Sequence, residues 1–341
     1  MKLLIVLLFA LSTVWAKPYI DMLGRSVAIP KAQTMVFLGP GALRLGVYLG
    51  LQERVIGLEQ AELSPVSMPP YREYFRMQKT QKLPIVGVGG PGKMPNLEAL
   101  IVNKPDVIFT SFLSADQIAV IAQKTGIPVV ALSYGVSYGG SSSDNLGDIK
   151  RSLELIGKIT GVSARAEQVV SFIKSEEEAL ASIKLPKKSL YIGGISYKGV
   201  QPLTSTDANY PPFELLGVKN AVLEGKTLKG HQFIDFEALL KTDPDLIFTD
   251  GQSKDRIAQD YAEHTKRYTA LQAYAKGNVK EVLGFNNYGT NVENLLLISW
   301  QIAAYLGHDG ALNQKALTVY DAFYPKSGKA LLSKLSYRFE Q

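Results

Sequence analysis

One pattern of helix, turn and strand occurs twice in the chain, and it constrains the fold more than any other feature. Residues 96–111 read NLEALIVNKPDVIFTS and residues 235–250 read DFEALLKTDPDLIFTD. In each copy a residue that can cap a helix comes first (Asn96, Asp235), and a Pro-Asp pair follows the helix. The apolar run after the pair is typical of a strand buried on both faces of a parallel sheet. We therefore expect one such unit in each half of the chain; a chance match between two common turns is the alternative.

Further apolar runs alternate with helical patterns in the first half of the chain. Strands are predicted at TMVFLG, RVIGLE, KLPIVGVG, DVIFTS and PVVALS, and a short β pair is predicted about Gly24 in YIDMLGRSVAIP. Alternation of strands and helices with short turns predicts a doubly wound α/β lobe. The fold class expected for the whole chain is α/β, with two such lobes.

A helix is predicted between the two copies of the repeat, over residues 162–184, because its apolar residues recur at helical spacing. Ser163 is the expected N-cap, and Pro186 ends the segment. Such a helix is about 30 Å long, the diameter of a small domain. We therefore expect a first lobe over residues 17–161, a rigid connecting helix over 162–186 and a second lobe over 187–341, with a ligand cleft between the lobes.

The first sixteen residues have the pattern of a secretory signal peptide. Lys2 precedes an apolar run, and Val14-Trp15-Ala16 matches the small-x-small cleavage signal, so cleavage is expected after Ala16. The alternative is a membrane anchor, for which a run of about ten residues is too short. The chain has no cysteine, hence no disulfide and no lipid attachment at the cleavage site. A freely diffusing protein of the bacterial periplasm is expected.

Charge and motifs argue for a binding protein. The net charge of +6 is spread along the chain without a long basic run, so nucleic-acid binding has little support. Residues 87–92 match G-x-G-x-x-G, but Pro91 lacks the N–H that a phosphate would need, which favours a structural turn. No nucleophile elbow, P-loop or H-E-x-x-H pattern occurs. We therefore expect no enzyme; a secreted hydrolase that uses the cleft and a sensor domain are the alternatives.

Two segments resemble one protein family. DMLGRSVAIP is similar to the D-x-x-G-R-x-V-x-I-P opening of the class III periplasmic binding proteins, and residues 96–108 are similar to their N-L-E-x-L segment with its Pro-Asp pair. The resemblance implies a receptor for an iron–siderophore, haem, cobalamin or related metal chelate, and CeuE-like receptors of iron or nickel chelates are the nearest type. It also implies delivery to an ABC permease and its ATPase, and we expect a monomer without a resident cofactor.

Ligands of open α/β sheets bind beyond the carboxyl ends of the strands. The residues expected there that suit an organic chelate are polar or aromatic: Gly41, Arg44, Phe112, Tyr134, Tyr197, His231 and Tyr288. The resemblance further implies that His231 and Tyr288 bind the metal, since imidazole suits nickel and iron and phenolate suits iron(III). The alternative for each is an ordinary surface residue.

The region after the second repeat departs from the catecholate receptors. These tend to carry an arginine just after the second-lobe strand, whereas IFTDGQSKDR places Asp250 there and Arg256 further on. The departure favours a chelate with less negative charge, such as nickel held by small amino-acid or siderophore-like ligands.

Glutamates on the two lobes are expected to dock the protein to the permease. The resemblance implies one glutamate from each lobe in contact with arginines of the permease. Glu98 matches the first-lobe position, and Glu214 in PPFELLGVKNAV matches the second-lobe position. The repeat itself indicates Glu237 instead, which we expect to act mainly within its own helix, near the favourable N-terminus. A solvated surface acid is the alternative for each.

Overall fold

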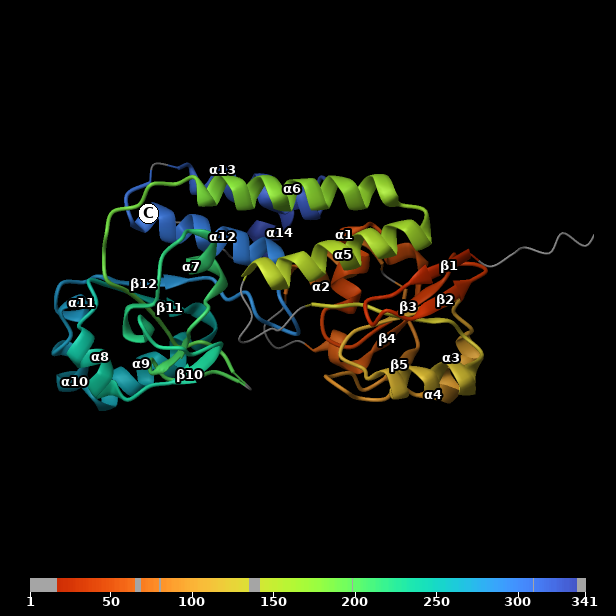
Figure 1. The fold of residues 1–341 in the computed structure, drawn as a ribbon, viewed down its shortest axis with the longest axis horizontal. Helices are drawn as coiled ribbons and strands as arrows, with labels where there is room; N and C mark the ends of the chain where they lie inside the picture. Colours follow the sequence, from red (N-terminus) through yellow and green to blue (C-terminus); the bar gives the residue numbers. More distant parts are fainter. Residues whose placement is uncertain are drawn as a thin grey trace, which may run out of the picture.

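The computed structural model describes residues 17–64, 69–79, 81–134, 142–197, 199–308 and 310–335. The predicted signal peptide lies outside the described residues. Figure 1 shows two α/β bodies side by side, with helices along one side of both. We call the body around the five-stranded sheet the first lobe, and the body around the three-stranded sheet the second lobe. Among the described helices none is long and apolar enough to cross a membrane.

The first lobe contains five parallel strands at the places where the apolar runs predict them. Their order across the sheet is β5-β4-β3-β6-β7, with bounds β3 Met35–Leu38, β4 Val55–Glu59, β5 Ile85–Gly87, β6 Val107–Thr110 and β7 Val129–Ala131. Strands β3, β6 and β7 are buried at every residue, as expected for a parallel sheet covered on both faces. The predicted β pair near Gly24 is also present, as β1 Lys17–Ile20 and β2 Ser26–Ile29.

The second lobe has a smaller sheet. Parallel strands β8 Leu190–Gly193, β11 Leu246–Asp250 and β12 Val279–Val282 lie in the order β12-β11-β8. Beside them an antiparallel pair is formed by β9 Ser205–Asp207 and β10 His231–Phe233. The predicted α/β class with parallel sheets is therefore confirmed.

Helices connect and cover the strands. Those of the first lobe are α1 Ala42–Tyr48, α2 Pro70–Gln78, α3 Leu97–Asn103 and α4 Ala115–Thr125. Two long helices follow, α5 Ser142–Thr160 and α6 Ser163–Ala181. The rest are α7 Pro211–Leu215, α8 Phe236–Thr242, α9 Lys254–Glu263, α10 Thr265–Thr269, α11 Gln272–Ala275, α12 Val292–Tyr305, α13 Leu312–Phe323 and α14 Gly328–Lys334. Single 3-10 turns lie at Gln52–Arg54, Gln60–Leu63, Ala221–Leu223 and Gly251–Ser253.

The repeated sequence forms the same unit twice, as α3 with β6 and as α8 with β11. Both helices end on a residue in the left-handed conformation, Lys104 with φ 44° and Asp243 with φ 43°. The caps differ: the Asn96 side chain accepts a hydrogen bond from the Ala99 N–H at 3.0 Å, whereas Asp235 makes no side-chain cap. The prediction of a cap by Asp235 was therefore wrong, although its position at the helix start was correct.

The aspartate of each Pro-Asp pair ties the unit to the neighbouring strand. Asp106 Oδ2 accepts hydrogen bonds from the backbone N–H groups of Gln33 at 2.9 Å and Thr34 at 2.8 Å, just before β3. Asp245 Oδ2 accepts one from the Ser189 N–H at 2.8 Å, just before β8. The repeat thus fixes the start of the adjacent parallel strand in each lobe.

Helix α6 occupies the place where the long helix is predicted, but it starts and ends within the predicted range. Val162 is its N-cap and no side chain caps it, so the expected cap by Ser163 is wrong. Near its start Arg165 donates to the Tyr48 carbonyl at 2.9 Å, and nearer its end Glu176 accepts from Trp300 Nε1 at 2.6 Å. Figure 1 shows the helix lying along the side of both bodies.

The C-terminal helices return to the first lobe. Rings of Phe323 and Tyr48 are 4.6 Å apart, and those of Tyr324 and Tyr74 are 5.1 Å apart. Glu293 in α12 is completely buried and accepts a hydrogen bond from the Tyr324 hydroxyl at 2.8 Å. One hydrophobic core cluster runs through both lobes and these helices, so the two sheets share a packed helical layer.

Candidate functional site

Three of the residues predicted at the ligand site form the buried floor of the lobe junction. The Tyr134 hydroxyl donates to the Gly41 carbonyl at 2.6 Å, and a Cβ at Gly41 would lie 2.5 Å from the tyrosine ring, so only glycine fits there. Arg44 is completely buried and donates to the carbonyls of Thr290 at 3.0 Å and Asn287 at 2.8 Å. In this conformation all three residues are buried and offer no surface to a ligand, and Arg44 links the first half of the chain to the second.

Tyr288 crosses from the second half of the chain into the first lobe. Its hydroxyl donates to Glu59 Oε2 at 3.0 Å and accepts from the Gly90 N–H at 2.8 Å. Its backbone adopts φ 51°, a strained value for a residue other than glycine. The Arg72 guanidinium lies 5.1 Å from the centre of its half-buried ring. The structure therefore places Tyr288 at the junction, engaged with protein partners.

Glu59 is the acid beneath Tyr288. Its side chain is 2 % exposed, and the same carboxyl oxygen that accepts from Tyr288 also accepts from the Gly39 N–H at 2.9 Å. Burial raises the pKa of Glu59 to about 7, and it outweighs these two hydrogen bonds, which lower the pKa. The carboxyl at the end of β4 is thus close to half-protonated at neutral pH.

His231 and Tyr197 meet on the second lobe. Their rings are stacked with centroids 4.1 Å apart and planes 10° apart, and the Phe233 ring meets the imidazole edge-on at 4.6 Å. Both His231 and Tyr197 are half-buried. Burial lowers the pKa of His231 below its ordinary value, so the imidazole is neutral at physiological pH. A neutral imidazole is the form that binds transition metals.

A serine partner raises the hydrolase alternative for this histidine. Ser205 Oγ lies 2.7 Å from His231 Nε2, the distance of a nucleophile from its base. However, Ser205 is completely buried and its hydroxyl also donates to the Ile195 carbonyl at 2.7 Å. A substrate cannot reach this oxygen in the structure, so the contact orients the imidazole and does not activate a nucleophile.

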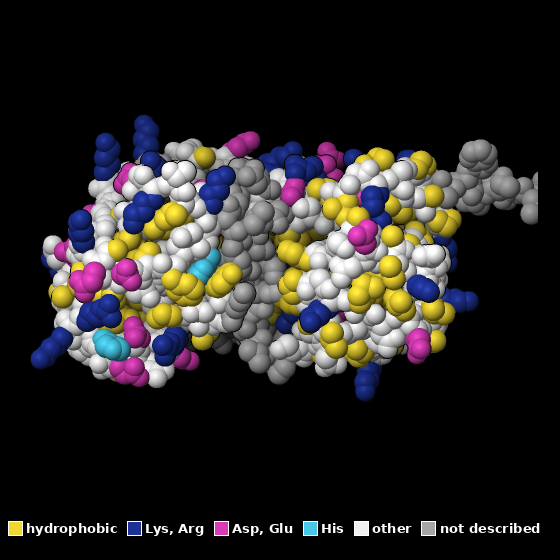
Figure 2. All heavy atoms as spheres, turned by 60° about the horizontal axis from the view of Figure 1, so that its bottom comes forward, with side chains coloured by type: hydrophobic (Ala, Val, Ile, Leu, Met, Phe, Trp, Pro, Cys, Tyr) yellow, Lys and Arg dark blue, Asp and Glu magenta, His cyan; other side chains and the backbone are white. Residues whose placement is uncertain are grey.

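Phe112 is the most exposed of the predicted ligand residues, with 40 % of its surface accessible. It follows β6 with φ 59°, and its carbonyl accepts from the Gly92 N–H at 3.1 Å. Gly92 ends the G-x-G-x-x-G match, whose Gly90 N–H is already bound to Tyr288. The glycine-rich segment is therefore a turn held by protein partners, as predicted. Exposed hydrophobic side chains occur on both lobes (Figure 2), including Phe112 and Phe233.

Asp250 does not supply the acidic charge that the sequence indicates. It is 5 % exposed and its side chain accepts from the Gln252 N–H at 2.9 Å within its own turn. Burial raises the pKa of Asp250 to about 7. Arg256 lies two residues into α9 and is exposed. The expectation that Asp250 faces the ligand as a charge is wrong, and the argument against an anionic chelate loses this support.

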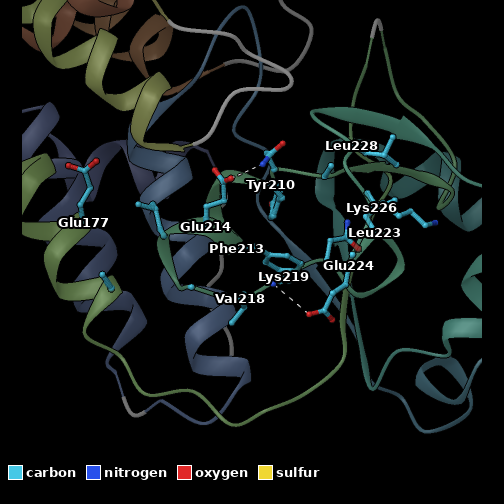
Figure 3. Close-up of a pocket in the computed structure, with 17 residues that line it drawn as sticks. Glu177, Tyr210, Phe213, Glu214, Val218, Lys219, Leu223, Glu224, Lys226 and Leu228 are labelled. Atoms are coloured by element: carbon cyan, nitrogen blue, oxygen red, sulfur yellow. Dashed lines mark hydrogen bonds and ion pairs between the residues drawn. The ribbon is translucent and has the colours of Figure 1, made fainter.

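The glutamates considered for docking lie in three different helices. Glu98 in α3 and Glu237 in α8 are exposed and occupy the same position of the repeated unit. Glu214 in α7 is half-buried and accepts from Asn209 Nδ2 at 2.9 Å. It lines a pocket of about 700 Å³, where Figure 3 shows it between Tyr210 and Glu177.

The partners of these side chains are not indicated by the sequence. Glu59 and Tyr288 are 229 residues apart and Arg44 and Thr290 are 246 apart, so no local spacing links them. The buried ion pair of Arg72 with Glu62, 2.7 Å apart, was also missed. The signal that could have indicated this edge is the occurrence of two acids, Glu59 and Glu62, where β4 ends.

A family model described as periplasmic binding protein matches residues 66–282. The chain is 26 % identical over 244 residues to an uncharacterized ABC transporter substrate-binding lipoprotein, YvrC of Bacillus subtilis, with 68 % of each chain covered.

Solved structures of low identity share the fold. A periplasmic solute-binding protein from Veillonella parvula aligns with a TM-score of 0.69 and 19 % identity, over 95 % of this chain and 99 % of that one. MolA of Haemophilus influenzae, bound to molybdate, aligns with a TM-score of 0.66 and 20 % identity, over 90 % of this chain and 98 % of that one. CeuE of Helicobacter pylori, with Ni(II) bound, aligns with a TM-score of 0.62 and 14 % identity, over 93 % of this chain and 99 % of that one.

Proposed function

Because the chain belongs to the periplasmic binding protein family and is the substrate-binding component of an ABC importer, we propose that its ligand is a metal chelate. The chelate is of the iron(III)–siderophore type or a nickel complex, and it is delivered to an inner-membrane permease driven by an ATPase. The protein acts by recognition and release, without covalent chemistry.

The observation that carries this proposal is the stacked pair of His231 and Tyr197. A neutral imidazole suits nickel and iron, and the half-buried aromatic rings beside it suit the organic part of a chelate. Exposed Phe112 on the first lobe adds a second apolar surface. The organic part is thus held by aromatic contacts and the metal by nitrogen.

Tyr288 is the second proposed metal ligand. Its phenol suits iron(III) once the proton is lost. In this structure the hydroxyl is engaged with Glu59 and Gly90, so coordination requires the exchange of these partners for the metal. Tyr288 therefore serves iron(III) chelates more than nickel chelates.

Location and attachment are part of the same proposal. The related YvrC is named a lipoprotein, whereas this chain has no cysteine to carry a lipid. We propose that the signal peptide is cleaved after Ala16 and that the mature protein diffuses freely in the periplasm as a monomer.

Calorimetric titration with Ni(II)–histidine and with a ferric siderophore tests the ligand class. We expect micromolar or tighter binding of one of them, weakened at least about tenfold by His231→Ala, because loss of a metal ligand or its support costs that much. Tyr288→Phe should weaken the ferric complex and abolish any visible iron–phenolate absorption band. His308→Ala, which changes another half-buried histidine, after helix α12, is the matched control. Tighter binding of molybdate than of any chelate would contradict the proposal.

A further inference from the structure

A second cavity lies in the first lobe, between helix α2 and the strands β4 and β5. Its volume is about 370 Å³, at the lower end of the range for small-molecule sites. None of the seven predicted ligand residues lines it. The lining is Leu43, Leu58, Gln60, Glu62, Leu63, Arg72, Phe75, Arg76, Lys79, Gln81, Lys82, Leu83 and Ile85.

The interior of this α2 pocket is apolar. Leu43, Leu58 and Phe75 are each at least 93 % buried. Leu63 and Ile85 also line the pocket and are 40 % and 38 % exposed, so apolar surface extends to its mouth. Burial of such surface by an apolar ligand is favourable by about 25 cal/mol for each Å² removed from water.

The charge around the α2 pocket is strongly one-sided. Four cationic side chains line it, and Glu62 is the single acid in the lining. Glu62 is already neutralised by its buried ion pair with Arg72 at 2.7 Å. The remaining cations, Arg76, Lys79 and Lys82, form no ion pair with any acid in the described part of the chain.

The ammonium group of Lys79 is held by two backbone carbonyls, which use two of its N–H donors. Its ammonium donates to the carbonyls of Glu53 and Val55, both at 2.9 Å. An ammonium has three N–H donors, so the third is available for a ligand. Arg76 and Lys82 are exposed and can turn toward an anion at the mouth. The pocket therefore combines an apolar interior with three uncompensated positive charges.

We propose that the α2 pocket binds a small amphipathic carboxylate, with its hydrocarbon part on Leu43, Leu58 and Phe75 and its carboxylate at Arg76, Lys79 and Lys82. A cation of the same size would meet like charge, and a fully polar anion would leave the apolar interior unfilled. The lining contains none of the proposed chelate ligands, although Arg72 also packs on the Tyr288 ring. The two proposals are tested with different ligands and different variants, so either can fail without the other.

Calorimetry with octanoate tests the pocket. Two comparison ligands each carry one half of octanoate: 1-octanol has the hydrocarbon chain without the charge, and acetate has the carboxylate without the chain. We expect one octanoate per chain, and at least about tenfold weaker binding of either half-ligand. The variant Arg76→Glu with Lys82→Glu should weaken octanoate at least about tenfold. Both side chains are exposed, so its thermal unfolding should stay unchanged. Lys124→Glu, an exposed lysine at the end of α4, is the matched control and should bind as the parent does.

Three results would each overturn the inference. Equal affinity for octanol and octanoate would show an apolar crevice without selection for charge. Octanoate binding that survives the double charge reversal but is lost in Tyr197→Ala would place the ligand at the proposed chelate site, beside His231. Absence of octanoate binding at millimolar concentration would remove the site altogether.

Discussion

Glu59 is a buried acid at the contact between the two halves of the chain, and its protonation makes the stability of the fold depend on pH. Its carboxyl is buried and accepts hydrogen bonds from the Gly39 N–H and the Tyr288 hydroxyl. Burial raises its pKa from 4.5 to about 7. Since the pKa in the folded state lies above that in the unfolded state, the folded state binds more protons between these values. The free energy of unfolding must therefore fall as pH rises from about 4.5 to about 7.

The first prediction is that Glu59→Gln flattens this pH dependence. At 1.36 kcal/mol for each pKa unit, the raised pKa corresponds to about 3 kcal/mol of stability lost across the window. The amide oxygen of glutamine can still accept from Gly39 and Tyr288, so the variant should be the more stable protein at pH 7. Urea unfolding at pH 5, 6, 7 and 8 measures the slope.

Glu98→Gln, which changes an exposed acid, is the control for this series and should keep the parent slope. Asp207 and Asp250 also have pKa values raised to about 7 by burial, so part of the pH dependence should remain in Glu59→Gln. An identical slope in Glu59→Gln and the parent would show that the Glu59 carboxyl does not retain its proton in the fold.

Residue-level contacts were the least predictable part of the site. The sequence indicates which side chains follow a strand, but His231 is the first residue of β10 and its contact with Tyr197 was not predicted. It carries no information on whether Arg44 or Tyr134 faces solvent, because burial is decided by segments such as residues 287–290 that are distant in the chain. The same distance hides the contact of Tyr288 with Glu59.

At the scale of elements, the repeated helix–strand unit offers an internal comparison. Asp106 accepts hydrogen bonds from two backbone N–H groups just before β3, and Asp245 accepts one hydrogen bond just before β8. We predict that Asp106→Ala lowers the free energy of unfolding by about 2 kcal/mol, from the loss of acceptors for two backbone donors. Asp245→Ala should cost less, since a single donor loses its partner. Equal costs, measured by urea unfolding, would show that these contacts do not set the stability of the units.

Helix α6 is the element that lies against both lobes. A proline at exposed Lys174, in the middle of the helix, removes one backbone hydrogen bond and should cost about 3 kcal/mol. Lys174→Ala keeps the helix and is the control. Small-angle scattering should show a larger difference between free and bound protein in Lys174→Pro than in the parent. A parent that already closes by a large hinge rotation on binding would contradict the expected rigidity.

The elements themselves were largely readable from the sequence. Buried parallel strands have continuous apolar runs, and proline and glycine mark the turns between them, so all five strands of the first lobe were found. The predicted caps of α6 and α8 failed because a residue at a helix start need not turn its side chain toward the backbone. The return of the C-terminal helices to the first lobe could not be predicted, since it depends on long-range packing such as that of Phe323 on Tyr48.

At the scale of the whole molecule, docking to the permease requires an exposed contact on each lobe. We predict that Glu98→Ala and Glu214→Ala each reduce uptake in cells while chelate affinity stays unchanged, because rim charges act mainly on the rate of association. Glu237→Ala is the decisive comparison, since Glu237 repeats the position of Glu98 and is more exposed than Glu214. Loss of uptake in Glu237→Ala but not in Glu214→Ala would assign docking to the repeated unit.

Packing and hydrogen bonds join the two lobes, so we predict that a ligand binds without a large movement between them. One core cluster joins both lobes, and Arg44, Tyr48 and Tyr288 fix the crossing segment. Under the proposed function, small adjustments at the junction would suffice to retain or release the ligand.

Native mass spectrometry of the protein isolated from periplasm, combined with metal analysis, tests the central claim most directly. The account predicts a 1:1 complex whose added mass is that of an organic chelator with one iron or nickel ion, and its loss in His231→Ala. A co-purified ligand that contains no metal, or a bare oxyanion such as molybdate, would contradict it.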